Sequence, residues 1–374
     1  MSADLLHALE QLEKEKGVNK EILIEAIEAA LISAYKRNFG VSQNVKVLID
    51  RDNGDFRVFA LKRVTSDPKN DLLDISLEDA RQIDKKFEEE DVVEIEVTPR
   101  TFGRIAAQTA KQVVVQRIRE AERGIIFDEF SNKEGDIVTG IIQRIERKNV
   151  IIDLGKTEAM LSFTEQAQGE EYKFNERIKC YIIEVKKTSK GPQIMLSRTH
   201  PGLVKRLFEL EVPEIHDGTV EIKSIAREPG SRTKIAVYAK DENVDPVGSC
   251  VGQKGTRVQA VVDELRGEKI DIIKWSSDPM EYISSSLSPS KVVRVDISEE
   301  DKSTRVIVPD FQLSLAIGKE GQNARLAAKL TGWKIDIKSE SQLRASIEQQ
   351  MFSMNSGFDA DDNGSDDFNG DELL

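Results

Sequence analysis

Two short glycine-containing stretches, VGQKG (251–255) and IGKEG (317–321), are the parts of the chain whose spacing suggests chemistry. Each has an apolar residue, a glycine, two polar residues and a second glycine. Glycines let the backbone approach a ligand closely, and the free N–H groups of a helix that follows attract phosphate. The stretches could therefore be nucleotide-binding loops, simple helix–turn–helix corners, or clamps for the backbone of a nucleic acid.

The spacing excludes a Walker nucleotide-binding loop. That motif has a glycine, four further residues and then Gly-Lys-Ser/Thr. Counted from Gly248, the place of the second glycine holds Gln253. The second stretch does not match either, because Lys319 is followed by Glu320.

Both stretches lie inside a repeated unit. In each copy, two predicted strands precede a helical segment, the glycine stretch, a second helical segment and a strand with the sequence KIDI (269–272 and 334–337). An internal repeat is stronger evidence than a single motif. It favours the GxxG loop of a KH domain, which holds about four nucleotides over an apolar groove, against an incidental turn. The candidate RNA contacts are Gly252, Gln253, Lys254 and Gly255 in the first loop and Gly318, Lys319, Glu320 and Gly321 in the second.

The remaining sequence predicts the elements that carry this repeat. Residues 19–39 have apolar side chains at helical spacing and Asn19 as an N-cap, which predicts a helix with Ile24, Ile27, Leu31 and Tyr35 facing a core. The segments 45–50, 56–64 and 92–97 are predicted strands, the first two joined by a turn at 52–54. A long helix is predicted over 104–123, closed by Gly124. From about residue 133, five short strands within about 70 residues predict a barrel of the OB type.

Composition limits the class of protein. The chain has 374 residues, 39% hydrophobic and 32% charged, so two to four domains are expected. No apolar run approaches the ~20 residues that span a bilayer, and the N-terminus lacks the features of a secretory signal. Two cysteines and three histidines are scattered, which predicts no disulfide framework, no metal site and no cofactor. We expect a cytoplasmic protein.

Net charge is −13, which argues at first sight against a nucleic-acid partner. The distribution changes this interpretation. Residues 345–374 contain eight acidic residues and no Lys or Arg, whereas residues 131–344 are close to neutral. The acidic segment has few apolar residues, so we expect it to be a disordered tail.

Residues 242–275, together with the order of the predicted domains, resemble the NusA family of bacterial transcription factors. The resemblance covers about residues 1–344. It implies an α+β multidomain fold that ends in the acidic tail. The implied parts are an α+β N-terminal domain with its linking helix (1–130), an S1 barrel of the OB type (133–199), two tandem type II KH domains (200–276 and 277–344) and the tail (345–374).

The resemblance also implies a function without catalysis. Members bind RNA polymerase at the flap of the β subunit near the RNA exit channel, and their S1–KH–KH body holds nascent single-stranded RNA and RNA hairpins. They modulate pausing, intrinsic termination and antitermination together with other elongation factors, and a monomer is expected. Two alternatives remain at this stage, a ribosome-associated or RNA-maturation factor and the RNA-feeding part of a ribonuclease.

The S1 region departs from the strongest RNA-binding pattern. The places where many S1 domains carry stacking aromatics hold Lys148 and Ile151, and Ser162 stands where histidine is common. Base stacking by this barrel is therefore in doubt. Several basic residues could still contact phosphates, or simply form a solvated face. They are Arg144, Arg147, Lys148, Lys186, Lys187 and Arg198.

The linking helix carries a further candidate surface. Arg104, Gln108, Lys111 and Val115 follow a spacing that places them on one helical face. The resemblance places this helix near the RNA exit channel. We hypothesise that Arg104 and Lys111 contact the backbone of exiting RNA or its hairpin, the alternative being an ordinary exposed face.

Overall fold

The computed structural model describes residues 2–39 and 44–358 and divides into two compact units. The first comprises residues 1–129 with 187–192, and the second comprises 130–186 with 193–374.

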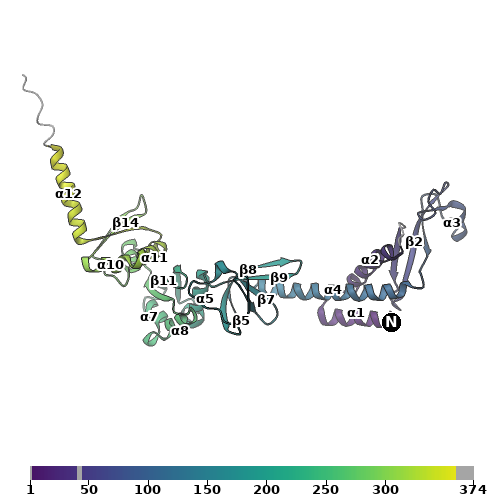
Figure 1. The fold of residues 1–374 in the computed structure, drawn as a ribbon, viewed down its shortest axis with the longest axis horizontal. Helices are drawn as coiled ribbons and strands as arrows, with labels where there is room; N and C mark the ends of the chain where they lie inside the picture. The colour runs from purple at the N-terminus through teal and green to yellow at the C-terminus, as the bar shows by residue number, and fades with distance from the viewer. Residues whose placement is uncertain (1, 40–43, 359–374) are drawn as a thin grey trace, which may run out of the picture. The chain divides into compact units, whose positions relative to one another are not determined.

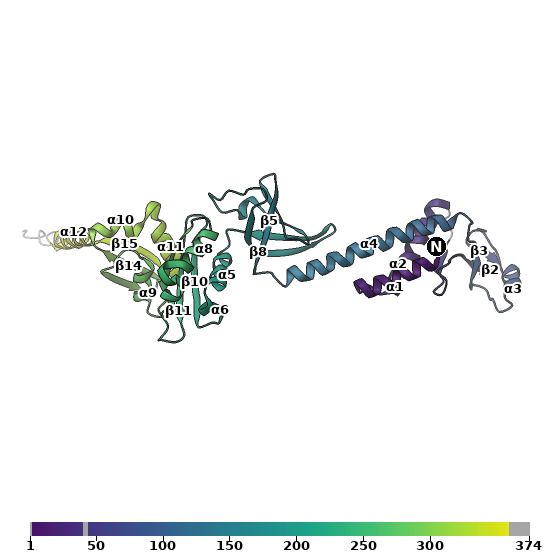
Figure 2. The same cartoon turned by 90° about the horizontal axis from the view of Figure 1, so that it is seen from below.

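Among the described residues, the first unit combines four helices with a four-stranded sheet. Helix α1 (Ser2–Lys16) runs beside α4 (Phe102–Ser131), and α2 (Lys20–Phe39) packs into the same core (Figure 1, Figure 2). Their shared core includes the predicted stripe of α2, with Ile24, Ile27 and Leu31 fully buried, and the Asn19 carboxamide accepts from the N–H of Glu21. The predictions for this helix and its cap are confirmed.

The sheet of this unit is organised around one long central strand. Strand β2 (Phe56–Thr65) pairs antiparallel with β1 (Val45–Ile49) and β4 (Val92–Glu96) and parallel with β3 (Asp74–Ser76). The short helix α3 (Leu77–Ile83) begins at Ser76, whose side chain accepts from the N–H of Asp79. The predicted hairpin and the strand near residue 92 are thus present.

Helix α4 is longer than the sequence predicts. It continues through Gly124 to Ser131, so the expected end at Gly124 was wrong. One glycine inside a helix costs only about 1 kcal/mol relative to alanine. The apolar residues that follow, of which Phe130 is buried, are enough to continue the helix.

The second unit begins with a closed five-stranded barrel, as predicted. Its strand order is β5-β6-β7-β9-β8. Strand β5 is antiparallel to β6 and to β8, β6 is antiparallel to β7, and β7 is parallel to β9. The strands are β5 (Ile137–Glu146), β6 (Asn149–Asp153), β7 (Glu158–Leu161), β8 (Arg177–Thr188) and β9 (Gly191–Ser197). A short 3-10 helix, η1 (Phe163–Glu165), follows β7.

Two copies of one α/β unit follow the barrel. Each has a three-stranded sheet in which the first two strands are antiparallel and the third is parallel to the second. The first copy contains α5 (Pro201–Glu211), α6 (Pro213–His216), β10 (Val220–Glu228), β11 (Arg232–Ala239), α7 (Pro246–Val251), η2 (Gln253–Gly255), α8 (Thr256–Glu264) and β12 (Lys269–Lys274). The second contains α9 (Pro279–Ser286), β13 (Arg294–Ser298), β14 (Ser303–Val308), η3 (Asp310–Gln312), α10 (Leu313–Ile317), η4 (Lys319–Gly321), α11 (Gln322–Thr331) and β15 (Lys334–Ser339).

The two copies pack against each other through an apolar cluster. The sheet of the first copy contributes Ala226, Ala236 and Ile273, and the helices of the second contribute Tyr282, Leu326 and Leu330. The hydroxyl of Tyr282 donates to the carbonyl of Leu330, 3.1 Å away. This packing fixes the spacing between the two glycine loops.

The last helix, α12 (Glu340–Phe358), extends beyond the repeat. It makes residues 345–358 helical, although the sequence places them in a disordered tail. The rest of that predicted tail, 359–374, lies outside the described residues. Among residues 2–39 and 44–358, no helix has the length and apolar character needed to cross a lipid bilayer.

Candidate nucleic-acid interface

The two GxxG loops have the same backbone conformation. The first glycine has φ 73° and ψ 176° in one loop and φ 76° and ψ 173° in the other. The third position also matches, with φ 53° at Lys254 and φ 52° at Glu320. All three positive-φ positions of each loop lie where side chains are usually strained, which explains the glycines at both ends. The repeat therefore preserves one rigid backbone shape.

In each copy, the side chain five positions after the first glycine hydrogen-bonds to the backbone of the helix that precedes the loop. In the first copy, the Arg257 guanidinium donates to the carbonyl of Ser249 at 2.6 Å. In the second, the amide nitrogen of Asn323 donates to the carbonyl of Ala316 at 3.1 Å. A Cβ on Gly318 would lie 2.8 Å from the backbone nitrogen of Asn323, so no larger residue fits there without a shift. Arg257 and Asn323 were not among the sequence predictions, although the aligned repeat places them at equivalent positions.

The first loop borders a shallow pocket of about 550 Å³. Gln253 lines it and the side chain of Lys254 is exposed. Arg257 also lines the pocket and forms an ion pair with Glu214, at 3.0 Å. Lys254 is thus the cation of this loop that faces solvent.

The second loop borders a pocket of about 470 Å³ that is shared by the barrel and both repeat copies. Gln168 comes from the barrel and Ser231 from the first copy, while Lys319 and Arg325 come from the second. Arg325 pairs with Glu228 at 3.2 Å. Burial raises the pKa of Glu228, but hydrogen bonds from Gln322 and Arg325 outweigh it, and the pKa falls below its ordinary value.

Arg198 is not available to RNA, so its prediction as a phosphate contact was wrong. Its side chain is fully buried, and its Nε lies 3.0 Å from a carboxylate oxygen of Glu170. It also donates to the carbonyls of Lys179 and Glu264, which joins the barrel to the first repeat copy. Burial alone would lower the pKa of Arg198, but the bond and charge of Glu170 raise it overall. A basic residue at a strand end can serve a domain junction, and spacing alone does not distinguish the two roles.

The other basic residues of the barrel differ in exposure and in whether an acidic side chain pairs with them. Arg144 is exposed, but it holds Glu158 through two bonds of 2.7 and 2.8 Å, and this pairing raises its pKa. Lys186 pairs with Glu184 at 2.9 Å. Arg147 and Lys148 form the exposed turn between β5 and β6, with φ 47° and 72°.

Phe163 is an aromatic candidate that the sequence analysis missed. Its side chain is 60% exposed, and the ammonium of Lys148 lies 5.2 Å from its ring centroid. It stands one position after Ser162, so the search for aromatics at the usual strand positions did not reach it. Its backbone N–H donates to the side chain of Asn149, at 3.1 Å.

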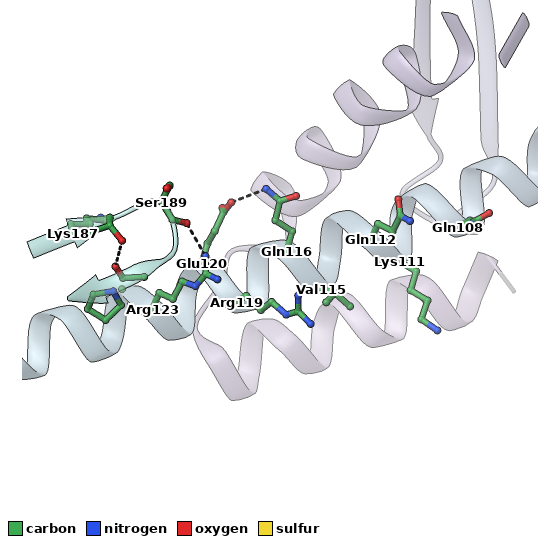
Figure 3. A pocket seen from close by; sticks show the side chains of 14 residues that line it. Gln108, Lys111, Gln112, Val115, Gln116, Arg119, Glu120, Arg123, Lys187 and Ser189 are labelled. Carbon is green, nitrogen blue, oxygen red and sulfur yellow. Dashed lines mark hydrogen bonds between the residues drawn. The ribbon is translucent and has the colours of Figure 1, made fainter. Parts of the chain in front are cut away.

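The linking helix presents the predicted polar face. Arg104 and Lys111 are exposed, while Phe102, Ala106 and Ala110 on the opposite face are buried. Lys111 lines a groove of about 1110 Å³ between α4 and the turn that joins β8 to β9, whereas Arg104 lies outside its lining (Figure 3).

This groove carries more cations than the sequence analysis named. Arg119, Arg123 and Lys187 line it together with Lys111. The guanidinium of Arg123 donates to the carbonyl of Ser189 at 3.1 Å, which links the helix to the turn (Figure 3). Of the charged residues that line the groove, four are therefore cations and one, Glu120, is an acid.

The described residues offer little for metal or thiol chemistry. Within 2–39 and 44–358, no group of three or more His, Cys, Asp or Glu residues is arranged to hold a metal ion. Burial raises the pKa of Cys180 and of Cys250 to about 12, so both thiols stay protonated at neutral pH. What the chain displays instead is a closed barrel followed by two glycine loops of equal geometry, the arrangement of a multidomain RNA-binding protein.

Comparisons with known proteins agree with this class. The family models that match are NusA N-terminal domain (residues 4–124), S1 RNA binding domain (131–197), NusA-like first KH domain (198–275) and NusA-like second KH domain (279–345). The chain belongs to the NusA family.

Two similar proteins that carry the NusA name align with this chain over most of the length of both. The transcription termination/antitermination protein NusA of Halalkalibacterium halodurans is 65% identical over 342 residues, 91% of this chain and 90% of that protein. The protein of that name from Bacillus subtilis is 65% identical over 344 residues, 92% and 93% of the two chains. A solution structure of the N-terminal domain of B. subtilis NusA is 63% identical and covers 33% of this chain and 99% of its own, with a TM-score of 0.31.

Proposed function

We propose that this protein is a non-enzymatic transcription elongation factor that binds RNA polymerase and the nascent RNA. It acts in the cytoplasm as a monomer, without a cofactor, and modulates pausing, intrinsic termination and antitermination. Its domains are the N-terminal domain (1–130), the S1 barrel (133–199) and the two KH domains (200–276 and 277–344). The observation that carries the proposal is the pair of GxxG loops with equal backbone geometry, held on one rigid tandem.

The RNA contacts are the two loops, 252–255 and 318–321. Each offers half-buried glycine backbone and the N-terminus of a following helix, α8 or α11, to phosphates. Each loop alone holds only about four nucleotides. Because packing fixes both loops on one body, the second contact forms at high effective concentration once the first is made.

The N-terminal domain is the part that binds the polymerase, at the β-subunit flap near the RNA exit channel. It has a core of its own, formed by α1, α2, β1 and α4. The groove along α4 contacts the backbone of exiting RNA or its hairpin, with Lys111 at the groove and Arg104 about two helical turns before it. Arg147 and Lys148 are further phosphate contacts from the barrel.

The test uses core bacterial RNA polymerase and a single-stranded RNA as separate probes. The full chain should capture both, whereas a chain lacking residues 1–130 should lose the polymerase and keep the RNA. Lys254→Glu should weaken RNA binding and leave polymerase capture unchanged. Capture of RNA without polymerase by the full chain would contradict the proposal and favour a ribosome-associated or RNA-maturation factor.

A further inference from the structure

An ion pair lies beside the first KH loop and joins α8 to the short helix α6. The Nη1 atom of Arg257 lies 3.2 and 3.0 Å from the two carboxylate oxygens of Glu214. The same nitrogen donates to the carbonyl of Ser249, 2.6 Å away. Both charged side chains are about one-third exposed, so the pair is in contact with solvent. An acid therefore stands next to the loop at which RNA phosphate is expected.

The ion pair and the loop line the same pocket. Gly252 and Gln253 contribute to it from the loop, and Thr256 contributes from the first position of α8. Glu214 and Arg257 complete the same lining. A phosphate that binds at the loop from this pocket would therefore lie near both members of the pair.

Arg257 keeps one edge of its guanidinium for a further ligand. A guanidinium carries five N–H donors, and its Nε and Nη2 atoms form an edge that matches two oxygens of a phosphate. Among residues 2–39 and 44–358, Nη1 alone accounts for the side-chain hydrogen bonds of Arg257. A phosphate can therefore bind the Nε–Nη2 edge while the bond to Ser249 remains.

The second copy shows that the charge of Arg257 is not needed to shape the loop. Asn323 occupies the equivalent position, is buried, and donates to the carbonyls of Ala316 and Leu287. The first glycine and the third loop residue nevertheless have nearly the same dihedral angles in both copies. Because a neutral amide supports the same backbone shape, the charged pair of the first copy has a task beyond shaping its loop.

The fold fixes the place of Glu214. It lies in α6, which begins at Pro213, a residue whose ring fixes the backbone angle φ at the start of the helix. Val212 and Ile215, on either side, are buried in the core of the first copy. The backbone of Glu214 cannot move away without exposing these apolar side chains, so its carboxylate stays at the pocket whether or not RNA is bound.

We propose that Arg257 binds an RNA phosphate at the first KH loop and that Glu214 is a counter-charge that weakens this contact. The phosphate binds the Nε–Nη2 edge of the guanidinium. The carboxylate of Glu214, at Nη1, neutralises part of the guanidinium charge and repels the phosphate. This inference rests on the proposed RNA-binding function.

The counter-charge sets the RNA affinity of the first loop below the value that its cations alone would give. A unit charge about 6 Å from phosphate in water changes binding about threefold. An exposed ion pair adds little to the stability of the fold, so the main effect of Glu214 is on RNA. Because affinity differences at one interface arise mainly in dissociation, the acid should shorten the lifetime of the contact, which suits a transcript that moves past the site.

The experiment measures binding of a fluorescent single-stranded RNA of about ten nucleotides, enough for two sites of about four, to the full chain over a range of KCl concentrations. Glu214→Gln should lower the Kd about three- to fivefold and steepen the slope of log Kd against log salt by at most about 0.7, since an uncompensated cation then faces phosphate. Arg257→Asn, which introduces the residue of the second copy, should raise the Kd at least about tenfold and make the slope shallower by about 0.7.

Glu209→Gln is the matched control for the loss of one acid. Glu209 pairs with Arg206 at 2.6 Å in the same domain, outside the lining of the pocket. This variant should change the Kd less than twofold. Circular dichroism of each variant separates loss of binding from loss of fold. If Arg257→Asn does not fold, Arg257→Lys takes its place, because lysine keeps the charge but lacks the planar edge, and its Kd should also rise.

A Kd for Glu214→Gln that rises, or that stays within twofold of the unaltered chain, would overturn the inference and leave the proposed function standing. So would an equal gain from Glu209→Gln, or a folded Arg257 variant that binds RNA like the unaltered chain. If the unaltered chain binds no RNA at low salt, the proposed function fails together with the inference.

Discussion

The ammonium of Lys234 lies 3.0 Å from a carboxylate oxygen of Asp271, and the same two positions of the second repeat copy hold Arg305 and Asp336, whose charged atoms are 3.9 Å apart. The Lys234 side chain is fully buried and also donates to the carbonyl of Ser288, in the second copy. Arg305 is 52% exposed. The same cation position is therefore buried in the first copy and exposed in the second, because the first sheet packs against helices of the second copy.

Because Lys234 is buried and Arg305 is exposed, replacing each should lower the free energy of unfolding by a different amount. Lys234→Ala should lower the free energy of unfolding of the KH tandem by about 3 kcal/mol, because it leaves a cavity in place of a fully buried side chain and removes its bond to Ser288, although Asp271 keeps Arg232. Arg305→Ala, the matched control, should cost less than about 1 kcal/mol. Urea unfolding followed by fluorescence of Trp275 and Trp333 measures both, and equal costs would contradict the role given to domain packing.

Acid should weaken the same junction. Burial would raise the pKa of Asp271, but its bonds to Arg232 and Lys234 outweigh it, and the pKa lies below the ordinary 3.8. A carboxyl with a depressed folded pKa contributes stability above its unfolded value and loses it as pH falls through the folded value. The free energy of unfolding should therefore decline below about pH 3.8. Asp271→Asn should flatten this decline, and an unchanged pH profile would exclude Asp271 as its source.

Exchanging the charges of the two loops should change RNA affinity in opposite directions. Lys254→Glu should weaken binding and Glu320→Lys should strengthen it, each about 30-fold, since a unit charge about 4 Å from phosphate in water is worth about 1 kcal/mol and a reversal changes the charge by two units. The salt slope should fall by about 0.7 in the first variant and rise by about 0.7 in the second. Equal effects of opposite sign are expected because the backbones match, and an unaffected Glu320→Lys variant would show that the second loop does not face phosphate.

Reversing the charges on the linking helix should reduce hairpin-dependent pausing. Arg104→Glu with Lys111→Glu places two negative charges on the exposed face of α4, and we expect the pause lifetime to shorten severalfold in a transcription assay. Arg117→Glu is a suitable control, because Arg117 lies on the same helix, outside the groove lining, and pairs with Glu120. A pause that persists unchanged with both reversals would exclude this face as an RNA contact.

Replacing the buried Arg198 should lower the free energy of unfolding more than replacing the exposed Arg144. Arg198→Ala should lower the free energy of unfolding by about 3–5 kcal/mol, because Glu170 would remain buried without its partner. Arg144→Ala should cost less than about 1 kcal/mol, since that pair is exposed. Thermal unfolding distinguishes them. An Arg198→Ala protein that keeps its stability but loses RNA affinity would restore the original prediction of a phosphate contact.

Several elements were predictable because their signals are local. The helix from Asn19, the hairpin near Gly54 and the five barrel strands each follow from caps, turns and alternation within a few residues. The repeat was visible because both copies keep the same glycines and the same terminal strand. Equal spacing produced equal loop dihedrals, so the shape of the candidate site was contained in the sequence.

The errors arose where distant residues meet. Arg198 looks like any basic residue until Glu170 and Glu264 are brought beside it from other elements. Gly124 looks like a helix end until the buried Phe130 is seen to extend α4. Phe163 was missed because its exposure depends on the turn that follows β7, not on strand alternation.

The sequence by itself determined the order of domains, the family and the doubled glycine loops, because these depend on local patterns and on the repeat. Only the tertiary structure decided which charges are free. It buried Lys234 and Arg198 at domain junctions and left Lys254 and Glu320 in solvent. The physical reason is that the energy of a charge or an apolar ring depends on what covers it, and covering is a property of packing between segments far apart in the chain.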